Sequence, residues 1–248
     1  MKRAQNTVGV VIPTYRETES LRSLLLSLAE SENLVGYVIV VDDSENGEST
    51  RIALSLVNYF EERKKHLEIL SNYKKTGRGS AVRQGLQTLY LHKEIEVFVE
   101  MDGDESHRSC EIGVMCEYIE EDNFIIASRY LPKSSISGWS TRRKVMSKIV
   151  NSLIRSVLNI EYSDCTNGYR AYPRSCVKIL ISHQPKVFDF LYLSEQALLL
   201  TRAGFIGREI PSQFINRTHG KSSVNLRVLL MALYSLCQIK YAVLRGTL

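Results

Sequence analysis

The stretch VFVEMDGD, residues 97–104, ends a short apolar run with two carboxylates one residue apart. Similar apolar, β-branched runs recur along the chain at residues 8–12, 38–41, 67–70 and 124–127. Between these runs, apolar residues repeat at helical spacing, which is typical of helices that cover a sheet. Strands separated by about thirty residues with helices between them form βαβ units. The sequence therefore predicts an α/β domain with a mostly parallel central sheet and helices on both faces.

Composition places the chain among ordinary globular proteins. Of its 248 residues, 44% are hydrophobic and 24% are charged, and its formal net charge is +5. These values exclude collagen-like, disordered and disulfide-stapled proteins. The length suits one α/β domain with a short appendage. The small positive excess suits any anionic ligand and is weak support for nucleic-acid binding.

Cysteine usage and hydropathy indicate where the protein works. The five cysteines form no C-x-x-C pair, so reduced thiols in the cytoplasm are expected. No secretory signal precedes the first strand-like run, and no run reaches the roughly 18 apolar residues of a membrane span. A helix expected within residues 224–248 is amphipathic. It packs on the core by default, and the alternative is contact with a membrane surface.

Asp102 and Asp104, at the end of the fourth apolar run, are candidate ligands for a metal ion. Two carboxylates at a strand end can hold a hard divalent cation, Mg²⁺ or Mn²⁺, which can also bridge a diphosphate. Most D-x-D triplets are solvated turns, but the apolar strand before this one favours the functional interpretation. His107, a single histidine beside acids, does not make a zinc site and is expected behind the ligands or on the surface.

Polar segments at the other strand ends favour a nucleotide ligand. Tyr15 can stack on a flat ring, and Asp42 and Asp43 can accept hydrogen bonds from a base or ribose. Gly79, in the segment 76–81, lies at a helix start where a phosphate can approach the backbone. Each segment alone is more often a capped turn, so only their combination points to a nucleotide.

Basic residues dominate the region that follows the fifth apolar run. Arg143 and Ser147 are four residues apart on one helical face and, with Arg129, can hold a phosphate. The alternative is a solvated basic face. Arg170 and Arg217 are candidates for further anion contacts or for structural ion pairs.

Taken in order, several segments resemble the family-2 inverting glycosyltransferases, in particular the branch of dolichol-phosphate mannose synthase and related polyprenyl-phosphate glycosyltransferases. The segments are PTYRETESL, VVDDSENG, TGRGSAVRQG, MDGDESH, SRY, GWSTRRKVMS, SDCTNGYRAY and INRTHGKSS. The early ones are shared by many sugar transferases, whereas the combination of SRY, W-x-x-R-R-K-x-x-S and D-x-T-x-G-Y-R-x-Y is much more specific to this branch. The chain departs from the pattern at Arg16, where Asn is common, at Leu193, where Gln is usual, and at residues 220–223.

The resemblance implies a GT-A fold over residues 1–223, with a nucleotide-sugar and metal half at 1–128, an acceptor half at 129–223 and the amphipathic helix at 224–248. It implies a metal ion, Mg²⁺ or Mn²⁺, held by Asp102, Asp104 and Ser106. The donor would be bound by Pro13, Tyr15, Glu17, Asp42, Asp43, Asp102 and Arg217. The lipid phosphate would be met by Arg129, Arg143 and Ser147, which with Asp104 are the expected catalytic residues.

The expected reaction is transfer of a hexose, mannose from GDP-mannose, to a polyprenyl or dolichyl monophosphate with inversion. The expected partners are a membrane surface on the cytoplasmic side and a small membrane-anchoring subunit, with no nucleic acid. Four alternatives remain open. They are a UDP-glucose or UDP-GlcNAc donor, a non-lipid acceptor with Asp164 or Glu195 as general base, a phosphatase of the haloacid dehalogenase type, and a non-enzymatic basic module that binds nucleic acid or acidic membrane.

Overall fold

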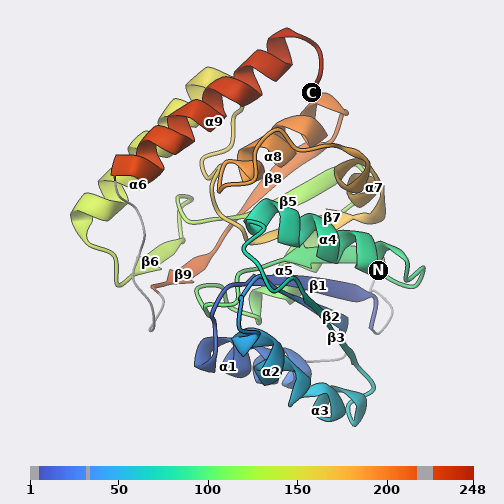
Figure 1. Cartoon of the computed structure of the whole chain (residues 1–248). Helices are drawn as coiled ribbons and strands as arrows, with labels where there is room; N and C mark the ends of the chain where they lie inside the picture. Colours follow the sequence, from blue (N-terminus) through green and yellow to red (C-terminus); the bar gives the residue numbers. More distant parts are fainter. Residues whose placement is uncertain (1–5, 32–33, 217–225) are drawn as a thin grey trace.

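A seven-stranded sheet in the order β3-β2-β1-β4-β7-β5-β8 forms the centre of the molecule (Figure 1). The computed structural model describes residues 6–31, 34–216 and 226–248. Within the last range, only the backbone is described for residues 226–230. The strands are β1 (Val8–Thr14), β2 (Val35–Asp42), β3 (His66–Ser71), β4 (Val97–Glu100), β5 (Asn123–Ser128), β7 (Arg170–Pro173) and β8 (Ile206–Pro211). Only β7 runs against its neighbours in this sheet. The predicted α/β class with a mostly parallel sheet is confirmed.

Helices cover both faces of the sheet (Figure 1). They are α1 (Glu19–Glu30), α2 (Glu48–Leu54), α3 (Val57–Glu61), α4 (Arg78–Tyr90), α5 (Glu111–Tyr118), α6 (Thr141–Leu158), α7 (Arg174–Ser182), α8 (Tyr192–Arg202) and α9 (Leu226–Leu244). Alternate residues of a strand point to opposite faces, so Val10 of β1 packs in one core and Val11 in the other. The core around Val10 contains residues of α1, α2, α3 and α5, and the core around Val11 contains residues of α4 and α6 to α9.

The strand β7 was not predicted from the sequence, in which residues 164–172 form a polar stretch. It lies between β4 and β5, antiparallel to both, and its four residues are buried. Arg170 is fully buried and donates hydrogen bonds to the carbonyl oxygens of Cys165, Asn167 and Leu193. It is therefore neither the anion contact nor the ion pair expected. A strand that contains Arg and Pro has no apolar run to reveal it.

A second, two-stranded sheet joins residues 135–137 to residues 213–215. It pairs β6 (Ser135–Ser137) with β9 (Gln213–Ile215) in parallel. Helix α6 begins shortly after β6, where the Ser140 hydroxyl accepts a hydrogen bond from the Arg143 amide at 3.3 Å. Within the described part of the chain, no helix has both the length and the apolar character needed to cross a membrane.

Candidate active site

The segments predicted to bind ligands meet at one edge of the large sheet. Strands β1, β2, β3 and β4 are parallel, and β5 points the same way because two antiparallel pairings, with β7 between, separate it from β4. The loops that follow these strands therefore emerge at the same, carboxyl edge. In open α/β sheets this edge is where ligands bind. The sheet topology thus places the segments predicted to bind a nucleotide, a metal ion and a phosphate at the same edge of the sheet.

Asp42 and Asp43 shape the loops at this edge with hydrogen bonds from the chain itself. The Asp42 carboxylate accepts from the amides of Ser44 and Thr50 at 2.8 and 2.7 Å, which holds the start of α2. The Asp43 carboxylate accepts from the amides of Thr76 and Gly77 at 2.8 and 2.9 Å. Both side chains are buried. The structure therefore gives this acidic pair a structural role, and contact with a nucleotide stays a prediction.

Gly79 is the second residue of α4, and its amide is used within the protein. Its amide donates to the carbonyl oxygen of Phe188 at 3.4 Å. A Cβ at Gly79 would lie 2.6 Å from the Tyr192 ring, so close packing alone requires glycine here. The predicted phosphate contact at Gly79 remains a prediction, and the structure supplies this second reason for the residue.

Tyr15 lies in the loop after β1, and its ring is half-buried. Its hydroxyl donates to Glu45 at 3.2 Å, and the Lys75 ammonium lies 4.6 Å from the ring centroid. Pro13, also half-buried, is in β1, and the Glu17 carboxylate accepts a hydrogen bond from the Ser20 hydroxyl at 2.9 Å. An aromatic face with a cation beside it suits a flat, negatively charged ligand.

The residues present at the end of β4 fit a divalent cation. Asp102 and Asp104 lie in the turn after β4, where the Ser106 amide donates to Asp104 Oδ1 at 3.1 Å. The Ser106 hydroxyl is buried and has no hydrogen-bond partner in the described protein, which is costly unless a ligand completes it. No group of three or more acidic, His or Cys side chains that could hold a metal occurs among the described residues. Two carboxylates suit an ion that keeps water and phosphate ligands.

His107 supports this turn from behind, which is one of the two places expected from the sequence. It is buried, and its Nδ1 accepts a hydrogen bond from the Asp102 amide at 3.1 Å. Nε2 therefore bears the proton and donates to Asn167 Oδ1 at 3.0 Å. The ring stacks on Tyr169 with a centroid separation of 4.9 Å. His107 thus fixes the backbone from which Asp102 projects.

Arg129 forms a buried ion pair with Asp164. Its Nε and Nη2 donate to the two carboxylate oxygens at 2.8 Å each, and Nη2 also donates to the Thr166 hydroxyl. Burial lowers the pKa of Arg129, but Asp164 and, at longer range, Asp102 raise it above the ordinary value. Arg129 is therefore a permanent cation close to the turn that contains Asp102 and Asp104.

Arg143 and Ser147 are connected to the Arg129 region through the neighbouring aromatic residues Tyr130 and Trp139. The Ser147 hydroxyl accepts from the Tyr130 hydroxyl at 2.6 Å. Trp139 joins the two arginines, because its ring centroid lies 5.4 Å from the Arg129 guanidinium and 3.9 Å from that of Arg143. The Trp139 Nε1 is buried and has no acceptor in the described protein. Trp139 was not among the predicted site residues, although it stands in the segment that resembles the polyprenyl-phosphate branch.

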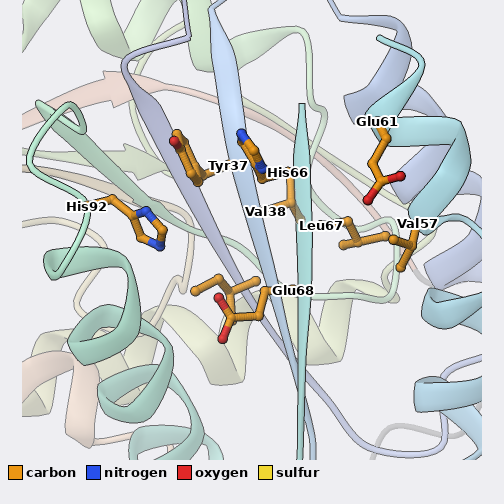
Figure 2. Close-up of a pocket in the computed structure, with 9 residues that line it drawn as sticks. Tyr37, Val38, Val57, Glu61, His66, Leu67, Glu68 and His92 are labelled. Atoms are coloured by element: carbon orange, nitrogen blue, oxygen red, sulfur yellow. The ribbon is translucent and has the colours of Figure 1, made fainter. Parts of the chain in front are cut away.

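Arg217, predicted to contact the nucleotide phosphates, lies outside the described residues. A cavity of about 160 Å³, drawn in Figure 2, lies near the amino ends of β2 and β3, away from the carboxyl edge. The Tyr37 ring stacks on His66 there, and burial together with Glu94 raises the pKa of Tyr37 to about 12. None of the predicted site residues lines this cavity.

The fold is an α/β domain that places the carboxylates of Asp102 and Asp104 and the guanidinium of Arg129 in loops at the carboxyl edge of its sheet. Glycosyl transferase family 2 matches residues 9–180. The chain belongs to this family and is a glycosyltransferase.

Curated relatives point to one branch of the family. The chain is 28% identical over 217 residues to a polyprenol monophosphomannose synthase of Mycolicibacterium smegmatis, covering 87% of this chain and 80% of the relative. It is 28% identical over 222 residues to an undecaprenyl-phosphate mannosyltransferase of Micrococcus luteus, covering 88% of this chain and 87% of the relative. These similarities support the resemblance to the polyprenyl-phosphate branch.

Solved structures confirm the fold. Glucosyl-3-phosphoglycerate synthase from Mycobacterium tuberculosis, in complex with Mn²⁺ and UDP-glucose, superposes with a TM-score of 0.63 and 16% identity, covering 94% of this chain and 79% of that one. A mannosyltransferase from Pyrobaculum calidifontis in complex with GDP-Man and Mn²⁺ superposes with a TM-score of 0.61 and 16% identity, covering 98% of this chain and 65% of that one. At these identities the likeness establishes the fold alone.

Proposed function

We propose that this chain transfers mannose from GDP-mannose to a polyprenyl or dolichyl monophosphate, with inversion at the anomeric carbon. The observation that supports this most is the cluster of Arg129, Arg143 and Ser147 beside the turn that contains Asp102 and Asp104. The cations suit the phosphate of an acceptor, and the carboxylates suit the metal that accompanies a donor diphosphate. The names of the two curated mannosyl-transferring relatives support the same substrates.

The acceptor phosphate needs no general base, because it is already anionic near neutral pH. Its oxygen attacks the anomeric carbon as the bond from that carbon to the diphosphate breaks, and the nucleoside diphosphate departs. The two side chains considered as bases for a neutral acceptor are both engaged. Asp164 is bound to Arg129, and the Glu195 carboxylate accepts from the amides of Lys186 and Val187 at 2.7 and 3.1 Å. A soluble sugar or protein acceptor is therefore disfavoured.

In this proposal the arginines act by placing the acceptor. Arg143 and Ser147 would bind the incoming phosphate, while Arg129, locked by Asp164, would keep a positive charge beside it. Orientation of the two reactants is the main contribution of such a site. Asp102, Asp104 and Ser106 would hold a divalent cation, which neutralises the charge that develops on the leaving diphosphate.

A panel of labelled donors with and without EDTA tests the reaction. The purified chain is incubated with polyprenyl phosphate, Mg²⁺ or Mn²⁺, and labelled GDP-mannose, UDP-glucose or UDP-GlcNAc. We expect lipid-extractable label with GDP-mannose, and loss of at least about 90% of it with EDTA. Label from a UDP-sugar instead would replace the donor assignment, and undiminished transfer in EDTA would refute the metal role.

We also propose that the protein meets its lipid at a membrane surface on the cytoplasmic side, through α6 and α9. These helices contact each other at one end of the molecule (Figure 1). Helix α6 exposes Val145, Met146, Ile149 and Leu153, and α9 exposes Met231, Tyr234, Tyr241 and Leu244. Basic residues of α6, including Arg142 and Lys148, flank these side chains. An apolar face with a basic margin suits an anionic bilayer.

Flotation with anionic liposomes tests the membrane contact. We expect Ile149→Glu to lower the bound fraction about tenfold, because it replaces apolar area that the bilayer would bury by a charge that the anionic lipid repels. Leu91→Glu is the control, since Leu91 is also an exposed apolar residue and lies at the end of α4, away from α6 and α9. Failure of the unmodified chain to float would contradict direct contact and favour a membrane-anchoring partner subunit.

A further inference from the structure

Arg78 links three segments at the carboxyl edge of the sheet. It is the first residue of α4, and its side chain reaches the end of β4. Nε and Nη2 lie 2.9 and 2.8 Å from Asp102 Oδ1, Nη1 donates to Glu100, and Nη2 donates to the carbonyl oxygen of Gly168 at 3.3 Å. A planar guanidinium can donate hydrogen bonds in three such directions at once. A lysine ammonium is a compact point charge and lacks this planar arrangement of donors.

The surroundings fix the guanidinium tightly. Glu100 is completely buried, so its carboxylate depends on Arg78 for a counter-charge. Burial opposes the charge of Arg78, but Asp102 and Glu100 raise the pKa of Arg78 well above its ordinary value. A Cβ at Gly168 would lie 2.1 Å from Arg78 Nη2, so the guanidinium occupies the space that any other residue would fill at position 168.

We infer that Arg78 is a positioning residue for the metal site. It holds the Asp102 carboxylate in the orientation needed to bind the divalent cation, using the buried Glu100 and the Gly168 carbonyl as fixed anchors. Asp102 would otherwise swing more freely, because its side chain is 35% exposed. Groups that orient metal ligands in this way typically contribute about tenfold to 100-fold in metal affinity. The inference rests on the proposed role of Asp102 in binding the cation.

Two variants release Asp102 from Arg78 by different routes. Arg78→Lys keeps the positive charge and loses the planar guanidinium that reaches both Glu100 and Asp102. Gly168→Ala leaves every charged residue in place and displaces the guanidinium, which is the flexible end of a side chain. Arg83→Met is the matched control, because Arg83 is also on α4 and donates to the carbonyl oxygen of Ile181, away from the carboxylate pair.

The affinity for Mn²⁺ is measured by electron paramagnetic resonance of the free ion, with no sugar nucleotide or lipid present. We expect Arg78→Lys and Gly168→Ala each to raise the Kd for Mn²⁺ about tenfold, and Arg83→Met to leave it unchanged. In turnover assays the KM for Mn²⁺ should rise in proportion, while kcat at saturating Mn²⁺ changes less. A general loss of folded protein would not produce this separation.

Equal Kd values, within twofold, for the unmodified chain, Arg78→Lys and Gly168→Ala would overturn the inference. An unmodified chain that binds no Mn²⁺ would overturn it together with the proposed metal role. Because no acceptor is present, an error in the proposed acceptor or sugar leaves the binding result unchanged and is revealed only by the transfer assay.

Discussion

Replacing Asp104 by Asn should lower kcat/KM for sugar transfer about 100-fold. Asn has nearly the same shape, and its side-chain oxygen can still accept the Ser106 amide hydrogen bond that Asp104 Oδ1 accepts at 3.1 Å. The turn is therefore kept, and what is lost is the negative charge that would hold the cation against the donor diphosphate. The measurement is the rate of lipid-extractable label at saturating Mn²⁺.

Glu105→Gln is the control for this variant. Glu105 is the neighbouring acid in the same turn, with a φ of 58°, and Gln removes its charge with little change of shape. We expect a rate within about threefold of the unmodified chain, since a substitution away from the proposed ligands has a small effect. A rate for Asp104→Asn as high as that of Glu105→Gln would contradict the metal assignment.

Replacing Asp164 by Asn should lower the free energy of unfolding by about 3–5 kcal/mol. The substitution leaves the buried Arg129 guanidinium without its counter-charge, although the size of the side chain hardly changes. Denaturant titration measures the difference. Asp122→Asn is the control, because Asp122 is exposed, and it should change the free energy by less than about 0.5 kcal/mol. Equal stability of the two variants would contradict the importance of the pair.

The Asp164 pair also predicts a pH dependence. Burial would raise the pKa of Asp164, but the charge and hydrogen bonds of Arg129 lower it below its ordinary value of 3.8. A carboxylate with a lowered folded-state pKa stabilises the protein above its unfolded-state pKa, and this contribution is lost as the pH falls through the folded-state value. Stability of the unmodified chain should therefore fall more steeply below about pH 4 than that of Asp164→Asn.

The sequence predicted the parallel strands and the edge at which they end, because both follow from short periodic patterns. Leu21, Leu24, Leu25 and Leu28, expected on one helical face, are all buried in α1. Arg129, Arg143 and Ser147 are connected through Trp139 and Tyr130, and their joint contact with a phosphate stays a prediction. By contrast, Ile52, Leu56 and Phe60 also recur at helical spacing but do not share one helix, because Ile52 lies in α2, Leu56 is the N-cap of α3 and Phe60 lies in α3.

Contacts between residues far apart in the chain could not be predicted from the sequence patterns. The Asp43 carboxylate binds amides 33 and 34 residues away, and Arg78 meets Gly168, 90 residues further along the chain. Asp43, predicted to bind a ligand, thus connects two loops, and Arg78, which was not among the predicted site residues, connects α4 to the segment before β7. The pairing of β7 with β4 brings the segment 164–168 to the end of β4 and makes the Arg78 contact possible. Because β7 contains Arg170 and Pro173, it could not be recognised as a strand from the sequence.

The most direct test of the proposed acceptor is a pair of lipids that differ only in the phosphate. The chain is incubated with labelled GDP-mannose, Mn²⁺ and either undecaprenyl phosphate or undecaprenol in the same detergent. Without a general base to activate a hydroxyl, we expect label in the organic phase with the phosphate and at least about 100-fold less with the alcohol. Equal transfer to the alcohol, or transfer only to a soluble sugar, would contradict a site built around an anionic acceptor.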